Sequence, residues 1–271
     1  MSFNLVLPFF SSAIMVVFTI SVLRRYAARR SLHFLFWGIG LGMFAIASLA
    51  EAYLALAWNR WAFFAWYLFG AVMTAAWIGH GTTYLMFRKR WVHVLTGLLA
   101  AGSLFAVYLM TQALDRIDPT VFSTSRPISE QYATRRLEEG QAAPEGVETA
   151  VIEYRGEQVT VTSGLLPLGT PVRLTTPFFN IYGLLSLVGG ALWSAVLFLR
   201  KRVLPNRVIG NVLIAAGALL VGTASTLTRL GYGEFLYLGE LLAALVMFAG
   251  FRVAARPEPA EALQAFPASA T

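Results

Sequence analysis

The chain of 271 residues has no cysteine and few charged side chains. The lack of cysteine excludes disulfides, thiolate nucleophiles and cysteine-ligated zinc or iron–sulfur clusters. Only 13% of the residues are charged, whereas 57% are hydrophobic, which is unusual for a soluble globular protein. Lysine occurs only at Lys89 and Lys201, and histidine only at His33, His80 and His93. No Ser–His pair, metal-binding cluster or nucleotide-binding motif is recognisable, so the sequence does not predict an enzyme.

What the chain has instead is seven long apolar stretches. Each contains about 20 or more residues, enough at 1.5 Å per residue to cross the roughly 30 Å hydrocarbon core of a bilayer. They cover residues 4–23, 32–57, 61–87, 91–113, 177–199, 207–229 and 233–254. The pattern predicts an all-α integral membrane protein, a seven-transmembrane helix bundle with the lipid bilayer as its main partner.

Basic residues near the ends of these stretches orient the bundle. Thirteen lie on one side, close to the spans: Arg24, Arg25, Arg29, Arg30, Arg88, Lys89, Arg90, Arg200, Lys201, Arg202, Arg207, Arg252 and Arg256. The short loops on the other side carry only Arg60 and Arg229. The positive-inside rule therefore predicts a multi-pass protein of the cell membrane, with its N-terminus outside and its C-terminus in the cytoplasm. Because the basic residues mark helix ends, the net charge of +7 does not predict a nucleic-acid partner.

An insertion between the fourth and fifth spans holds nine of the fourteen acidic residues. Helix-forming residues run from Ile128 to Gly140, with Ser129 as a candidate cap, and alternating β-prone residues flank Arg155 and Gly156 as in a hairpin. We expect a small extracytoplasmic α/β cap over the outer mouth of the bundle. The alternative is disorder across residues 119–148.

The expected organisation has four parts along the chain. Transmembrane helices 1–4 occupy residues 1–113, the cap 114–176, transmembrane helices 5–7 residues 177–255, and a flexible cytoplasmic tail 256–271. Spans one to three and five to seven share an orientation, and both triplets have a basic first loop and a short second loop. This similarity suggests a parallel 3+1+3 repeat of the kind found in transporters.

Two acidic residues within the spans are the strongest candidates for a binding site. Glu51 in the second span and Glu240 in the seventh both lie about 10 Å below the outer surface, judged from the helical rise. Their helical neighbours are small, which favours protein-facing positions. A carboxyl group at membrane depth is costly and indicates function by default. We expect the two to form a coupled polar pair in an outward-facing pocket; the alternative is two structural groups, each protonated or paired locally.

Polar residues on the neighbouring faces complete the predicted pocket. The sixth span carries a stripe of small and polar residues that includes Thr226 and ends at Arg229, and the fifth span offers Asn180 on a similar face. The candidate ligand-binding residues are therefore Glu51, Glu240, Arg229, Asn180, Tyr237 and Thr226. The alternative explanation is that these stripes only pack helices together.

No cofactor is predicted. Two histidines lie at the inner ends of spans and no pair shares a helix at i, i+4, so neither haem nor a metal site is expected. Arg60-Trp61 and the tract Tyr237-Leu-Gly-Glu-Leu-Leu-Ala-Ala resemble parts of the microbial rhodopsins. That family attaches retinal to a lysine in its seventh helix, where Glu240 stands here, so a retinal Schiff base is excluded. The topology is also similar to that of PQ-loop transporters, but their Pro-Gln dipeptides are missing.

Three functions agree with these features. The protein binds or senses a small molecule in the outward-facing polar pocket, which in a receptor-like protein requires a cytoplasmic signalling partner. Alternatively, it is a small transporter built on the 3+1+3 repeat. In the third case it is a non-catalytic subunit that docks onto other membrane proteins.

Overall fold

The computed structural model describes residues 3–87, 90–138, 143, 148–201, 205–229 and 235–256, and seven of its helices are long and apolar enough to cross a membrane. They are Val6–Arg29, Leu32–Leu54, Arg60–Met86, Trp91–Leu114, Val172–Arg200, Asn206–Leu227 and Phe235–Ala254. Their length and composition support a multi-pass membrane protein, which confirms the predicted seven-helix architecture. The predicted tail beyond Arg256 lies outside the described residues.

Five of the spans are single helices and two contain a π-helical segment. The single helices are α1 (Phe3–Arg29), α2 (Leu32–Leu54), α5 (Trp91–Leu114), α9 (Pro205–Arg229) and α10 (Phe235–Ala254). The third span joins α3 (Arg60–Ala65), the π-helical segment η1 (Trp66–Met73) and α4 (Thr74–Met86). The fifth joins α7 (Val172–Leu184), the π-helical segment η3 (Leu185–Gly189) and α8 (Gly190–Lys201). Such segments are rare and frequently lie at functional sites.

The first helix runs beyond the predicted end of its span at residue 23. Arg24 and Arg25 continue α1, and the Arg25 guanidinium lies 4.8 Å from the centre of the Phe251 ring. Long basic side chains can cover apolar surface while the charged group reaches water. The arginines therefore extend the helix past the apolar stretch.

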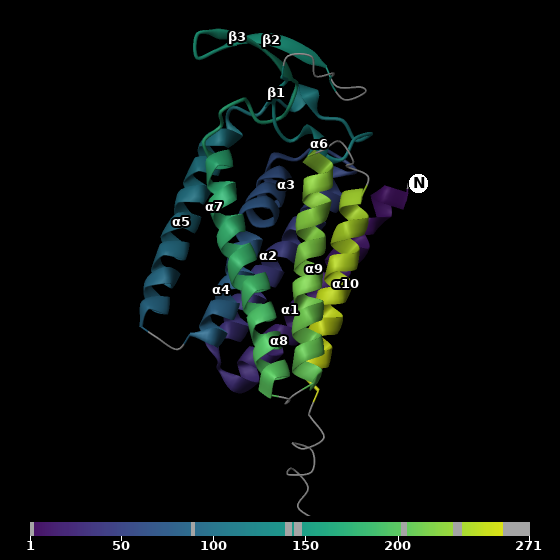
Figure 1. Cartoon of the computed structure of the whole chain (residues 1–271). Coiled ribbons are helices and arrows are strands. Elements are labelled where there is room, and N and C mark those ends of the chain that lie inside the picture. The colour runs from purple at the N-terminus through teal and green to yellow at the C-terminus, as the bar shows by residue number, and fades with distance from the viewer. Residues whose placement is uncertain are drawn as a thin grey trace, which may run out of the picture.

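Six of the spans form a ring, and α5 stands outside it (Figure 1). The helix α1 packs against α2, α2 against η1 and α4, and α4 against α7 and η3. On the other side α8 packs against α9, α9 against α10, and α10 against α1, which closes the ring. The helix α5 contacts the third span and α7, and its other side exposes apolar residues such as Val94, Leu98 and Leu104.

The helices α4 and α7 cross with their backbones in contact at two glycines. A Cβ on Gly183 would lie 2.3 Å from the carbonyl carbon of Ala75, and one on Gly79 would lie 2.8 Å from the carbonyl oxygen of Gly183. Small residues allow this close approach between membrane helices. The crossing brings the neighbouring polar residues His80 and Tyr182 within hydrogen-bonding distance.

The insertion folds into a cap at the end of the bundle where α1 begins (Figure 1). It contains a 3₁₀ turn η2 (Pro119–Val121), a short helix α6 (Ile128–Gln131) and the strands β1 (Arg135–Arg136), β2 (Thr149–Tyr154) and β3 (Glu157–Thr162). The strands form an antiparallel sheet in the order β1-β3-β2. The predicted hairpin is confirmed: Arg155 and Gly156 have φ angles of 57° and 83°, as a tight two-residue turn requires.

The helix predicted over Ile128–Gly140 is wrong in its length. It ends at Gln131, after which Ala133 bridges to Leu166 and β1 pairs with β3. Burial of Ala133 and strand pairing outweigh the helix propensity of this segment. Ser129 does not cap the helix, which begins after Pro127. Residues 119–138 thus have a defined fold, whereas residues 139–142 and 144–147 of the segment for which disorder was the alternative lie outside the described residues.

The cap and the adjoining end of the bundle share one hydrophobic core. Ile128, Leu165 and Leu166 of the cap belong to the same buried cluster as Phe63 and Trp66 of the third span. The buried Gln131 amide is fully used: its oxygen accepts from the Ser123 N–H, and its nitrogen donates to two carbonyls. The cap is therefore fixed firmly onto the bundle.

Candidate functional site

Glu51 lies in the last turns of α2, directly under the cap, and only 2% of its surface is exposed. The indole Nε1 of Trp66 donates a hydrogen bond of 3.2 Å to its Oε1. Trp66 is the first residue of η1, so the π-helical segment begins where this bond is made. A buried indole N–H needs an acceptor, and Glu51 supplies it.

Glu240 of α10 reaches Glu51 across the ring. The two carboxyl groups are hydrogen-bonded to each other, and Glu240 is half-buried. Because an ionised carboxylate has no hydrogen to donate, a hydrogen bond between them needs a proton on at least one of the two groups. The structure thus brings together the two carboxyls that the sequence predicted to form a coupled pair.

Tyr237 connects this pair to the cap. It lies one turn before Glu240 on α10, and only 4% of its surface is exposed. Its hydroxyl oxygen is hydrogen-bonded to the backbone N–H of Ile128 in α6, and Glu51, Glu240 and Glu130 all act on it electrostatically. Tyr237 therefore lies between the predicted carboxyl pair and the cap.

The cap closes the site from above. The Tyr132 ring lies 5.8 Å from the ring of Trp66 and 5.9 Å from that of Tyr67, between centroids. The cap thus covers Glu51, whereas Glu240 is half-buried.

A serine hydroxyl lies close by on the same helix. Ser48 is one turn before Glu51 on α2, is almost fully buried, and its Oγ has no hydrogen-bond partner among the described residues. A buried hydroxyl without a partner costs about 1–3 kcal/mol. Ser48 thus has an unused hydroxyl one turn from Glu51.

The other predicted residues are not joined to this cluster by any contact that the structure describes. The Asn180 Nδ2 donates a 3.1 Å hydrogen bond to the carbonyl of Ala71, within η1. Thr226 is exposed on α9, and its hydroxyl bonds the Gly222 carbonyl of the same helix. Arg229 ends α9, and its side chain lies outside the described residues.

Trp66 is the residue that sequence reasoning missed, since the tryptophans were attributed mainly to membrane interfaces and packing. One signal was present: Trp66 stands in the outer part of the third stretch, at a depth like that of Glu51. Exposed tryptophans such as Trp61 and Trp193 do fit a position facing lipid.

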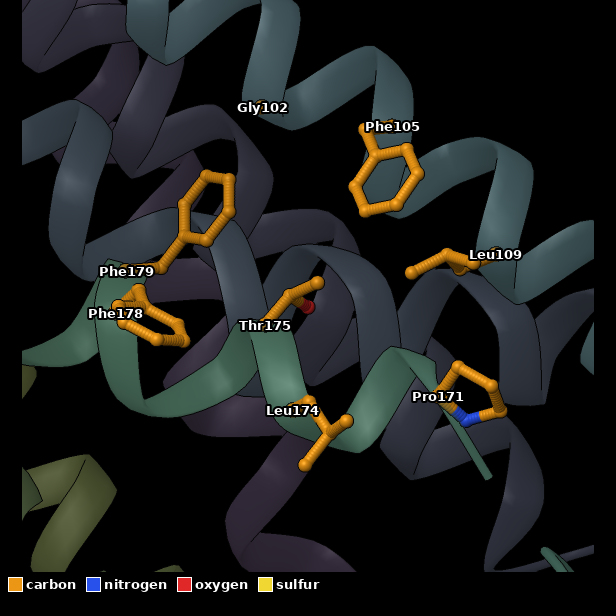
Figure 2. A pocket seen from close by; sticks show the side chains of 8 residues that line it. All are labelled: Gly102, Phe105, Leu109, Pro171, Leu174, Thr175, Phe178 and Phe179. Carbon is orange, nitrogen blue, oxygen red and sulfur yellow. The ribbon is translucent and has the colours of Figure 1, made fainter. Parts of the chain in front are cut away.

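A separate groove lies on the molecular surface between α5 and α7 (Figure 2). Its volume is about 340 Å³, and it is lined by Gly102, Phe105, Leu109, Pro171, Leu174, Thr175, Phe178 and Phe179. Its one hydroxyl, on Thr175, already bonds the carbonyl of Val172, and Phe178 is 76% exposed. The groove offers no free polar group, so it is not the predicted polar pocket.

No protein-family model, curated protein or solved structure matches this chain. The function must therefore be argued from the residues of the site.

Proposed function

We propose that the protein binds a small cationic molecule, such as an amine or a monovalent cation, at the carboxyl pair of Glu51 and Glu240. The observation that carries this proposal is the interaction between two carboxyl groups within the bundle, one of which, Glu51, is almost fully buried. A monovalent cation that replaces one proton shared by the pair leaves the net charge of the pair unchanged. Such an exchange would release the proton.

The surroundings of the pair supply further groups for such a ligand. The Trp66 indole orients Glu51, while the hydroxyls of Tyr237 and Ser48 can accept hydrogen bonds from an ammonium group. Of the described side chains, those in ion pairs lie elsewhere, at Arg60–Asp115 and Arg136–Glu157. Ionisable residues at membrane depth commonly mark ligand or ion pathways.

A small transporter is the second candidate, and the order of the helices favours it. Within each triplet the first span packs against the second and the second against the third. Each third span then packs against the first span of the other triplet, and the fourth span stands outside. This arrangement is that expected for a parallel 3+1+3 repeat, in which movement of one triplet against the other would open the covered site.

We further propose that the cap faces the outside of the cell and the C-terminus the cytoplasm. Described arginines at the ends of α1, α8 and α10, namely Arg30, Arg200 and Arg256, lie at the end away from the cap, in agreement with the positive-inside rule. Because the chain has no cysteine, single cysteines at Ser31 and Ala143 give unambiguous labels. They should react with an impermeant maleimide from opposite sides of intact membranes; reaction from one side would refute the orientation.

Ligand binding is tested by thermal unfolding of the purified protein in detergent. Sodium and ethylammonium chlorides are titrated against N-methylglucamine chloride at constant ionic strength. A ligand at 100 times its Kd stabilises the folded state by about 2.7 kcal/mol, which raises the melting temperature measurably. We expect a saturable rise in the wild type with at least one of the two cations.

Three variants locate the response. Glu51→Gln and Glu240→Gln should fold but lose it, because an amide carries no charge for the cation. Glu153→Gln, on the exposed strand β2, should keep the full response. A response that survives in both of the first two variants, or no response to either cation in the wild type, would contradict the proposal. Uptake of the active cation into proteoliposomes then separates a transporter from a sensor.

A further inference from the structure

A second polar cluster lies in the half of the bundle away from the cap. His80 of α4 is fully buried, with 0% of its surface exposed. Its Nδ1 lies 2.6 Å from the hydroxyl of Tyr182, and its Nε2 lies 2.9 Å from the Oγ1 of Thr96. The Thr96 hydroxyl donates a 3.1 Å hydrogen bond to the Tyr84 hydroxyl oxygen, which is 2.7 Å from the Nδ1 of His93. These contacts form one unbroken chain of hydrogen bonds.

The chain leads from the interior to the surface. His93 is exposed in the first turn of α5, at the end of the bundle opposite the cap. Packing fixes the members in between: the Tyr84 ring stacks on Phe36 with 5.0 Å between centroids and an interplanar angle of 15°. At the inner end, the glycine crossing of α4 and α7 holds Tyr182 against His80.

The partners of His80 suit a group that gains and loses protons. Neutral imidazole has one donor and one acceptor nitrogen, and the cation has two donors. Each ring nitrogen of His80 faces a hydroxyl, which can either donate or accept. His80 can therefore hold either neutral tautomer or the cation without losing a hydrogen bond. A backbone carbonyl, which only accepts, would instead fix one tautomer.

We propose that His80, Thr96, Tyr84 and His93 form a proton relay between the buried imidazole and the water at the end opposite the cap, while Tyr182 holds the other ring nitrogen of His80. In the outward step, protonated His80 gives its Nε2 proton to the Thr96 oxygen. The Thr96 hydroxyl proton passes to the Tyr84 oxygen, and the Tyr84 hydroxyl proton passes to the Nδ1 of His93. One bond to hydrogen forms for each that breaks, and one positive charge moves from His80 to His93.

Thr96 controls whether the relay is connected. Its hydroxyl also donates a 3.0 Å hydrogen bond to the carbonyl of Val92, on its own helix. Since the hydroxyl has one hydrogen, it points at one acceptor at a time. Rotation about the Cβ–Oγ1 bond thus joins or interrupts the chain, and resets it after each transfer.

The surroundings of His80 indicate a proton carrier. The elements around it present an aromatic edge from Phe36, hydroxyls from Tyr182 and Thr96, and the ring of Tyr84. None of these described contacts is with an acidic group, so a cation at His80 lacks a counter-ion and is short-lived. The relay does not include Glu51 or Glu240, so it stands or falls independently of the cation site.

The relay is tested by proton exchange at His80. The chain has three histidines, so protein labelled with ¹⁵N-histidine in lipid nanodiscs gives a simple NMR spectrum, assigned with a His33→Gln variant. The measurement is the rate at which the His80 ring N–H exchanges with water. We expect Thr96→Val and Tyr84→Phe each to slow exchange by about tenfold or more, which corresponds to an increase of about 1.4 kcal/mol in the barrier. Tyr84→Phe keeps the stacked ring and hence the packing.

Two further variants decide the route. Thr82→Val removes a buried hydroxyl of α4, the helix that carries His80. This hydroxyl accepts a 3.3 Å hydrogen bond from the Trp37 indole N–H but is not in the relay. The variant should therefore leave the exchange rate of the His80 N–H unchanged. Tyr182→Phe leaves the route from His93 intact and should preserve fast exchange. Wild-type rates in both relay variants would overturn the proposal. Equal slowing by Thr82→Val would show that opening of the bundle controls exchange, and equal slowing by Tyr182→Phe would place proton entry on the other side.

Discussion

Replacing Glu51 by leucine or by glutamine distinguishes a hydrogen-bonded buried group from one that merely occupies space. Glutamine keeps an oxygen for the Trp66 N–H and gains an N–H that can donate to Glu240. Both bonds survive in it, so we expect its free energy of unfolding to change by less than about 1 kcal/mol. Leucine has a similar volume and no polar atom, so it leaves the Trp66 N–H and the Glu240 carboxyl without their partner.

The size of the leucine effect follows from these two groups. An unsatisfied buried polar group costs about 1–3 kcal/mol, so leucine should lower the free energy of unfolding by about 2–6 kcal/mol. Hydrogen bonds between membrane helices measured by double-mutant cycles reach only about 0.6–1.7 kcal/mol. We therefore expect the lower half of the range, about 2–4 kcal/mol, because groups in a membrane protein find alternative partners.

The assay is reversible unfolding in mixed detergent micelles, followed by tryptophan fluorescence. A cycle of Glu51→Leu with Trp66→Phe isolates the bond between the two residues, and its coupling energy should lie near 1 kcal/mol. Leu49→Ala, at an exposed position on the same helix, serves as the control. Equal stability of the leucine and glutamine variants would refute the claim that Glu51 is a hydrogen-bonded buried group, and a coupling energy of zero would refute its bond to Trp66.

Two other predictions concern the glycine crossing and the cap. Gly183→Ala should destabilise the protein by about 1–3 kcal/mol through overpacking and weaken the His80 bond to Tyr182, whereas Gly189→Ala, with open space around it, should be neutral in the same assay. In the cap, hydrogen bonds from the Thr120 side chain and then its backbone lower the pKa of Asp118 below its usual range. The resulting stabilisation is present above the ordinary pKa of aspartate and is lost as the pH falls through the lowered value. Thr120→Val should raise the pKa of Asp118 in an NMR titration, and an unchanged titration curve would contradict this assignment.

The sequence was sufficient for features that depend on local composition. Seven apolar stretches predict seven spans because only a helix satisfies its own backbone within a bilayer. The Arg155-Gly156 turn predicts the hairpin because glycine readily adopts positive φ. Depth along a helix also placed Glu51 and Glu240 at the same level, so their contact could be anticipated.

Features that depend on contacts between distant segments were not predictable in this way. The segment after Gln131 has helix-forming residues, yet it leaves the helix because Ala133 is buried and β1 pairs with β3. The contact of Trp66 with Glu51, and the chain of hydrogen bonds at His80, depend on which faces of different spans meet. Periodicity within one helix gives no such information, and the π-helical segments change the phase between the two ends of their spans.

The π-helical segment η1 sets how far the side chains of the two polar clusters are rotated from one another about the axis of the third span. Trp66, at its start, faces Glu51, and His80, beyond its end, faces Thr96 and Tyr182. A π-helix accommodates extra residues per turn, so conversion of one such turn to α-helix, with a residue deleted, turns one end against the other by about 100°, the angle per α-helical residue. With Trp66 held under the cap, His80 would then point away from its hydroxyl partners. The side chains of Trp66 and His80 therefore both face their partners only while η1 retains its wider, π-helical turns.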